Sequence, residues 1–255
     1  MAASLTARQL TVVRGPLVVL DAVDLTLAPG RRVGLIGPNG VGKSTLLGAL
    51  AGAVALDRGS VAVTPQVANV GLLPQEPERS ASETVGAFLG RRSGVTAAQC
   101  ELDDAVNALA AGEPGADDRY SDALERWLAL GAADFDARVG ETWAELGLDP
   151  GLLDQPTNTL SGGEAARSSL ASLLLSRYDV FLLDEPTNDL DLDGLARLER
   201  WILGLDAPVL LVSHDRTFLE RVITDVVEID HHTHRAEWYS GGWSAFLAER
   251  ELARL

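Results

Sequence analysis

The chain has 255 residues, 46% of them hydrophobic and 23% charged, a balance typical of globular proteins. Its formal net charge of −16 opposes binding to nucleic acid by bulk attraction, and no apolar run approaches the roughly 18–20 residues that span a bilayer. The N-terminus lacks a signal-peptide core and the single cysteine, Cys100, has no disulfide partner, so we predict a cytoplasmic chain without membrane insertion. The simplest interpretation of Cys100 is a small buried helix residue.

Val- and Leu-rich stretches predict strands within residues 5–27, and a turn follows at 28–30. Residues 31–37 predict a buried strand and residues 43–52 a helix that ends at Gly52. Two further strands are expected at 59–63 and 68–75. This order of elements places a glycine-rich segment between a buried strand and a helix.

The segment from about Glu83 to Gly147 predicts helices, at 97–111 and 117–131. Tyr120, Leu124, Trp127 and Leu128 follow helical spacing and predict an apolar face on the second helix. Further along the chain we expect helices at 161–177, 192–205, 215–222 and 243–252, and strands at 179–185, 207–214, 224–230 and 236–239. Strands that alternate with helices around a buried parallel sheet predict the α/β class.

The stretch "GPNGVGKST" matches the pattern G-x-x-x-x-G-K-[ST] in the context of a strand and a helix. Glycines let backbone N–H groups surround phosphates, and the start of a helix adds positive potential. A chance glycine-rich turn is the alternative, and the strand–loop–helix context disfavours it. We therefore predict an ATP or GTP site formed by Gly37, Pro38, Asn39, Gly40, Val41, Gly42, Lys43, Ser44 and Thr45.

Lys43 is the only lysine among 21 basic residues. A compact charge on a thin stem suits a position between the β and γ phosphates, whereas a planar guanidinium is bulkier. Ser44 supplies a hydroxyl for Mg²⁺. "FLLDE" places Asp184 at the end of a buried strand, where it would reach Mg²⁺, and Glu185 next to it as a general base. The alternative for this acidic pair is solvent exposure or a helix cap.

The stretch "LSGGE" at 160–164 contains a capping box, with Ser161 as the cap and Glu164 three residues later. The box does not explain Gly162 and Gly163, because each glycine in a helix costs up to about 1 kcal/mol relative to alanine. Two glycines are reasonable there if a phosphate approaches the start of the helix closely. That phosphate would have to be held by another copy of the glycine-rich loop.

The chain resembles the ATP-binding-cassette (ABC) family over nearly its whole length. The motifs described above occur in the order typical of that family, together with Gln75 in "LLPQE", the loop ending at Asp191, and His214 in "LLVSHD". The resemblance implies a P-loop nucleotide-binding domain with a mixed, RecA-like sheet, an N-terminal antiparallel β subdomain and a helical lobe. Within one domain of residues 1–255 it implies four parts: β subdomain and P-loop core (1–82), helical lobe with an arm-like insert (83–150), signature helix and Walker B core (151–242), and the start of a linker helix (243–255).

The resemblance also implies ATP and Mg²⁺ as cofactors and a head-to-tail sandwich with a second ABC cassette, in the same chain or in a homodimer. Ser161 and Gly163 of one cassette, with Gly162 and Asp191, would complete the site around Lys43 of the other. Gln75 would join Mg²⁺ to the helical lobe, and His214 would contact the γ-phosphate, so that Lys43, Gln75, Glu185 and His214 form the expected catalytic set. The family places an aromatic residue against adenine where this chain has Arg14, whose guanidinium plane could stack on the base.

Three features resemble the ABC-F branch, which is soluble and connected with translation and antibiotic resistance: the loop "LLDEPTNDLD", the separation of 85 positions from Gln75 to Leu160, and the stretch "AEWYSGGWSAFLAERE". This branch implies the N-terminal cassette of a two-cassette protein that acts on the ribosome. Against it, residues 83–140 carry 11 acidic and 5 basic residues, the opposite of an RNA-binding patch. The alternatives are an ATPase subunit of a membrane transporter and a regulatory cassette with little turnover.

Three histidines at 231, 232 and 234 lie between two predicted strands, and we interpret them as a hairpin turn. A metal site there would need a further ligand that the sequence does not identify.

Overall fold

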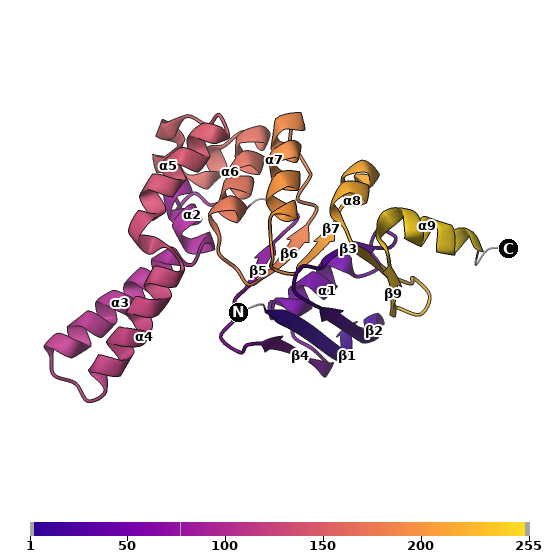
Figure 1. Cartoon of the computed structure of the whole chain (residues 1–255), viewed down its shortest axis with the longest axis horizontal. Coiled ribbons are helices and arrows are strands. Elements are labelled where there is room, and N and C mark those ends of the chain that lie inside the picture. Colours follow the sequence, from indigo (N-terminus) through magenta and orange to yellow (C-terminus); the bar gives the residue numbers. More distant parts are fainter. Residues whose placement is uncertain (1–2, 77, 253–255) are drawn as a thin grey trace. The chain divides into compact units, whose positions relative to one another are not determined.

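The computed structural model describes residues 3–76 and 78–252 (Figure 1). They form two compact units. The first consists of the chain up to Glu76, Tyr178–Asn188 and the chain from Leu195 onward; the second consists of residues 78–177 and Asp189–Gly194. This division groups the helix that follows "LSGG" with the helical segment, whereas the sequence-based scheme places it with the Walker B core.

A three-stranded antiparallel sheet of the first unit has the order β2–β1–β4. Its strands are β1 (Ser4–Arg14), β2 (Leu17–Leu27) and β4 (Arg58–Thr64). Alternate residues of β1 are buried, as expected for a sheet with one face on the core. The antiparallel β subdomain expected from the sequence is confirmed.

A six-stranded sheet has the order β5–β6–β7–β3–β8–β9 and is parallel except for β9, which pairs antiparallel with β8. Its strands are β3 (Arg32–Ile36), β5 (Val70–Leu73), β6 (Val180–Asp184), β7 (Val209–Val212), β8 (Asp225–Ile229) and β9 (Ala236–Ser240). Every residue of β6 and β7 is buried, which explains why both read as continuous apolar runs. The mixed sheet and the α/β class are therefore confirmed.

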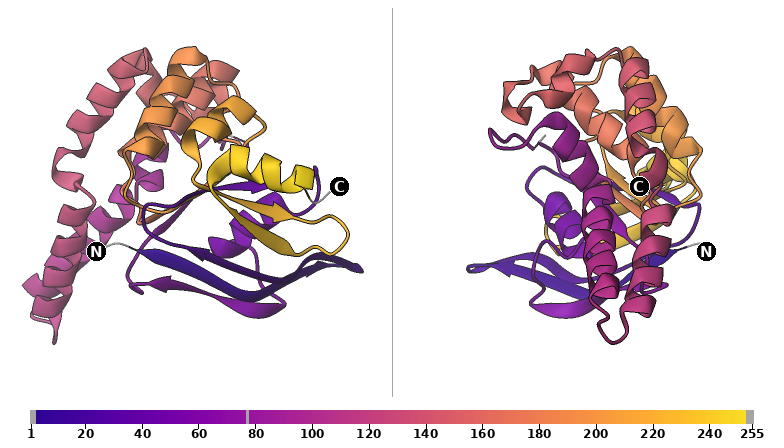
Figure 2. Two further views of the ribbon diagram at one scale, coloured as in Figure 1. Left: turned by 45° about the vertical axis from the view of Figure 1, so that its right-hand side comes forward. Right: turned by 90° about the vertical axis from the view of Figure 1, so that its left-hand side faces the viewer.

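The helices of the first unit are α1 (Lys43–Leu50), most of α7 (Leu192–Leu203), α8 (Arg216–Val222) and α9 (Gly242–Leu252). Helix α1 lies between the two sheets (Figure 2). Its Leu46 and Leu47 belong to one buried cluster with Leu5 of β1 and Leu210 of β7. Because α1 begins directly after the glycine-rich loop, this packing fixes the loop against both sheets.

The second unit is helical. It contains α2 (Val85–Arg92), α3 (Val95–Ala110), α4 (Ala116–Ala129), α5 (Phe135–Glu145), α6 (Gly162–Leu175) and the short helices η1 (Ala132–Asp134), η2 (Pro150–Asp154) and η3 (Thr157–Thr159). Helices α3 and α4 pack side by side as a hairpin (Figures 1 and 2). Among the described residues, no helix combines the length and the apolar character that a membrane span requires.

Two expectations for this hairpin are wrong. Leu128 is 54% exposed, whereas Ala123 and Leu130 are buried, so the contact face of α4 is rotated away from Leu128. Cys100 is also exposed, because it lies outside the face of α3 formed by the buried residues Ala98, Ala105 and Ala108. The turn interpretation of residues 231–233 is confirmed, since they join the paired strands β8 and β9.

Candidate nucleotide-binding site

A hollow of about 450 Å³ in the first unit, which we call the loop hollow, gathers predicted site residues from five separate segments. The predicted residues that line it are Arg14, Asn39, Gly40, Gly42, Lys43, Ser44, Thr45, Gln75, Asp184, Glu185 and His214. They meet because β3, β6 and β7 are parallel neighbours, so the segments that follow these strands lie at one edge of the sheet. Val19 and Val212 also line the hollow, and no sequence signal marks them as site residues.

The glycines of the loop are required by its geometry. Gly37 and Gly42 have φ values of 149° and 113°, and Gly40 has 79°. A Cβ at Gly42 would lie 2.9 Å from Cγ1 of Val19, and one at Gly37 would lie 2.9 Å from the Ile229 carbonyl oxygen. Only glycine fits both the backbone angles and the space.

Lys43 is held by its own loop. Its Nζ donates hydrogen bonds to the carbonyl oxygens of Gly37 and Pro38, at 2.8 and 3.1 Å. Burial lowers the pKa of Lys43, and the negative charges of Glu185 and Asp184 act against that shift. The ammonium group therefore lies in a partly dry position where an anion would stabilise its charge. Of the remaining loop residues, Val41 is buried in the core and contributes only its backbone to the loop.

Ser44 and Thr45 occupy the first turn of α1, which begins at Lys43 after Gly42 in a left-handed conformation. The first N–H groups of a helix have no partner within it, so this turn offers donors and positive potential to a phosphate. The Ser44 hydroxyl, the Gln75 side-chain amide and the Asp184 carboxylate line the same hollow. They are hard oxygen donors of the kind Mg²⁺ prefers, so the residues present fit that ion.

Glu185 lies one residue beyond β6 with a φ of 50°, a left-handed value that non-glycine residues rarely adopt. Its N–H donates to the Val212 carbonyl at 3.0 Å, which holds this turn against the end of β7. The side chain is 3% exposed, and its Oε1 has no hydrogen-bond partner among the described residues. Strained backbone and an unsatisfied buried oxygen are both features of sites that wait for a ligand.

His214 adjoins this carboxylate. The His214 backbone N–H donates to Oε2 of Glu185 at 3.1 Å, and its Nε2 lies 3.3 Å from Oε1. The loop after β6 and the end of β7 are also joined through the hydroxyls of Thr187 and Ser213, 2.9 Å apart. Glu185 and His214 are thus positioned as one assembly at the edge of the hollow.

Ser161, Gly162, Gly163 and Asp191 belong to the second unit and do not line the loop hollow. Ser161 forms the predicted capping box: its hydroxyl oxygen accepts from the Glu164 N–H at 3.4 Å, and its own N–H donates to Oε2 of Glu164 at 2.8 Å. The Ser161 hydroxyl also donates to Oε2 of Glu164 at 2.7 Å. A Cβ at either glycine would meet nothing within 4 Å. Asp191 accepts from the Gly194 N–H at 2.8 Å and lies 3.6 Å from Arg167.

A glycine-rich loop before a helix, with an acidic pair at the end of a neighbouring parallel strand, defines a P-loop nucleotide-binding domain. The family model described as "ABC transporter" matches residues 20–188. The chain therefore belongs to the ATP-binding-cassette family, whose cassettes are ATPase domains.

Several relatives place the chain more narrowly. It is 34% identical to the "Energy-dependent translational throttle protein EttA" of Mycobacterium tuberculosis, over 98% of this chain and 44% of that protein. It is 38% identical to the "Tylosin resistance ATP-binding protein TlrC" of Streptomyces fradiae, over 91% of this chain and 44% of that protein. It is 34% identical to the human "ATP-binding cassette sub-family F member 3", over 93% of this chain and 32% of that protein. The chain thus spans less than half the length of these relatives.

A solved structure described as the "ATP binding subunit of ABC transporter" has the same fold, with a TM-score of 0.72 and 20% identity. The match covers 97% of this chain and 93% of that one. It agrees with the α/β architecture found here.

Proposed function

We propose that this cassette binds and hydrolyses Mg-ATP, and that closure on a second cassette controls binding to the ribosome. The observation that carries the hydrolytic part is the convergence of Lys43, Asp184 and Glu185 on one hollow. Each would supply something different to the reaction, because Lys43 offers charge to the phosphates, Asp184 an oxygen to the metal, and Glu185 a base to the attacking water.

The residues of the loop hollow divide the work by position. Lys43 would exchange its two loop carbonyls for phosphate oxygens, and Ser44, Gln75 and Asp184 would hold Mg²⁺, which supplies charge neutralisation at the phosphates. Oε1 of Glu185, which accepts no hydrogen bond among the described residues, would accept a proton from the attacking water, while His214 keeps that carboxylate in place and reaches the terminal phosphate. Arg14 would lie along the base.

The second cassette follows from the glycines of α6. Gly162 and Gly163 leave open space where side chains would be, next to N–H groups at the start of a helix. Together with Ser161 and Asp191, they would meet the phosphate held by Lys43 of the other cassette. A site divided in this way ties hydrolysis to closure, so ATP would time how long the closed form lasts.

We assign the chain to the ABC-F branch, and the α3–α4 hairpin supports this assignment as the arm-like insert. Both arginines of the hairpin are already paired: Arg119 with Glu113 at 2.8 Å, and Arg126 with Glu101 at 3.2 Å. Since no basic side chain is left over within residues 95–129, all of which the structure describes, the hairpin would contact a ribosomal protein surface more readily than RNA phosphate. The names of two relatives, a translational throttle and a tylosin resistance protein, favour a role at the ribosome over a transporter subunit.

Glu185→Gln tests this function. Removing the base should reduce single-turnover ATP hydrolysis by about 10²–10⁴-fold and leave nucleotide binding within about twofold. The trapped form should then sediment with ribosomes only when ATP is present. Glu249→Gln, an exposed change on α9, is the control and should behave like the unaltered chain.

The outcomes separate the parts of the proposal. Normal hydrolysis by the Glu185→Gln variant would remove Glu185 from its role. If the ATP-bound Glu185→Gln variant captures an integral membrane protein and no ribosomes, the transporter alternative is supported. Tight ATP binding without turnover by the unaltered chain, alone or joined to a second cassette, would support a regulatory cassette.

A further inference from the structure

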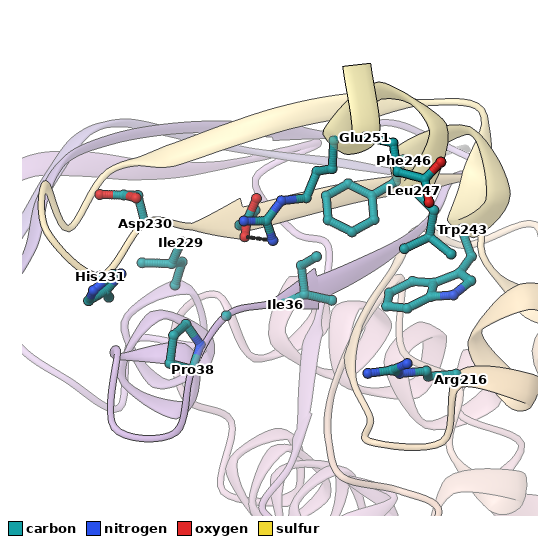
Figure 3. Close-up of a pocket in the computed structure, with 13 residues that line it drawn as sticks. Ile36, Pro38, Arg216, Ile229, Asp230, His231, Trp243, Phe246, Leu247 and Glu251 are labelled. Atoms are coloured by element: carbon teal, nitrogen blue, oxygen red, sulfur yellow. Dashed lines mark hydrogen bonds and ion pairs between the residues drawn. The ribbon is translucent and has the colours of Figure 1, made fainter. Parts of the chain in front are cut away.

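A second hollow, of about 590 Å³, lies in the first unit behind the start of the glycine-rich loop. Its walls come from the end of β3, the start of α8, the end of β8 with the turn that follows, and α9, so we call it the α9 hollow. Figure 3 shows Arg216 and Trp243 together at one end of it and Pro38 and His231 at the other. The volume lies within the roughly 300–1,000 Å³ of small-molecule sites.

One wall of the α9 hollow is apolar and partly aromatic. Trp243 and Phe246 lie one turn apart on α9 with ring centroids 5.6 Å apart, and Leu247, 45% exposed, continues this surface. Ile36 faces them from the end of β3 (Figure 3). Phe246 is already buried, so an apolar or aromatic group that fills this space would remove the exposed surface of Trp243 and Leu247 from water.

Most charged groups on the walls already have partners. Arg250 donates to Glu228 at 2.7 Å, and the Asp230 carboxylate accepts hydrogen bonds from the backbone of Thr233 and His232, at 2.7 and 3.0 Å. Arg216 and Glu251 differ, because within residues 3–76 and 78–252 neither side chain makes a hydrogen bond or an ion pair. Arg216 lies at the end of the hollow where Trp243 lies and supplies a free positive charge there, whereas the free negative charge of Glu251 comes from α9 (Figure 3).

We propose that the α9 hollow binds a small organic anion with an aromatic body, its anionic group on Arg216 and its ring against Trp243 and Leu247. A charge-assisted hydrogen bond and apolar burial would then act on one ligand. Because Glu251 also lines the hollow, a single anionic group fits better than a polyanion such as a nucleoside triphosphate.

Binding in the α9 hollow affects the nucleotide site through shared backbone. Gly37 and Pro38 line the hollow, and their carbonyls hold the ammonium of Lys43. Arg216 follows His214 by two residues, so the ligand also touches the segment that positions Glu185. The ligand and the nucleotide should therefore change each other's affinity by the same factor. This coupling rests on the proposed function, whereas the binding itself does not.

The test uses 8-anilinonaphthalene-1-sulfonate, an aromatic anion whose fluorescence rises in apolar sites, titrated into the full chain without nucleotide. We expect saturable binding that Arg216→Ala weakens about fivefold to tenfold, as for loss of one partly solvated charged hydrogen bond. Arg221→Ala, on the same helix but away from the hollow, is the control. Leu247→Asp should weaken binding more than tenfold by placing a like charge on the apolar wall, and Ala248→Asp should not.

Each result bears on the proposal. The proposed site is overturned if neither Arg216→Ala nor Leu247→Asp weakens dye binding. It is also overturned if ATP displaces the dye competitively, because the dye would then occupy the loop hollow. Loss of dye binding in both variants, with both controls unaffected, supports it. If saturating dye leaves ATP affinity unchanged, the coupling is overturned and the site stands. If the chain binds dye in the expected way but fails to bind ATP at all, the proposed function fails and the site stands.

Discussion

Helices α1 and α6 both begin next to glycines of a predicted motif, α1 after Gly42 and α6 at Gly162, and the surroundings of these glycines differ. At the start of α1, Gly42 has a positive φ, and a Cβ added to it would lie 2.9 Å from a side-chain carbon of Val19, so no other residue fits. At the start of α6, the backbone is helical and a Cβ would meet only open space. The fold therefore needs the glycines of the loop, whereas it would be more stable without those of α6. Glycines that cost stability indicate a requirement outside the single cassette.

The largest effect is expected for Gly42→Ala. The new methyl group would meet Cγ1 of Val19, and alanine would be strained at a φ of 113°, so the free energy of unfolding should fall by about 2–4 kcal/mol. Chemical denaturation measures this loss, and nucleotide binding should fail as well. Gly52→Ala is a useful control because Gly52 also has positive φ but an open environment; a similar loss there would remove the role of the contact with Val19.

The next effect concerns charge at the same loop. Lys43→Arg keeps the positive charge but puts a planar, bulkier group where Nζ reaches two loop carbonyls. We expect Mg-ATP affinity to fall at least tenfold, about 1.4 kcal/mol, by calorimetric titration, with unfolding little changed. Unchanged affinity would show that the loop needs only a charge.

Gly163→Ala should act in the opposite direction on stability. A methyl group in open space should raise the free energy of unfolding by about 0.5–1 kcal/mol, because it restricts the unfolded chain and favours the helix. ATP binding by one cassette should be unchanged, while hydrolysis by paired cassettes should fall. Full hydrolysis in the more stable variant would remove the phosphate argument for this glycine.

The smallest effect is a pH dependence at the start of α6. Hydrogen bonds from the Ser161 hydroxyl and N–H lower the pKa of Glu164, so its ionised form adds stability above the unfolded pKa and this stability is lost as pH falls through the folded pKa. Thermal unfolding should show a small deficit for Glu164→Gln at pH 7 that shrinks as the pH is lowered below the ordinary pKa of a glutamate. A deficit that stays constant as the pH falls would contradict this, and Glu125→Gln is the control.

The loop hollow could be predicted from sequence because its parts are short motifs at the ends of parallel strands, where the fold itself brings them together. The α9 hollow could not, since Ile36, Arg216 and Trp243 carry no shared pattern and meet only through the packing of α8 and α9. Helical spacing showed that α4 has an apolar face, but the direction of that face depends on α3. The prediction for Leu128 was wrong for this reason, and the prediction for Cys100 was wrong because its position on α3 lies outside the buried face of that helix.

The hydrogen bonds of Lys43 to Gly37 and Pro38 have a thermodynamic consequence. Nucleotide binding replaces them with bonds to phosphate, so the number of lysine hydrogen bonds need not rise and the measured enthalpy should be smaller than a count of contacts in the complex suggests. The loop also keeps its shape before the ligand arrives, so little ordering entropy is lost. A modest enthalpy with a small entropic penalty is the calorimetric signature we expect from a loop whose lysine is held in advance.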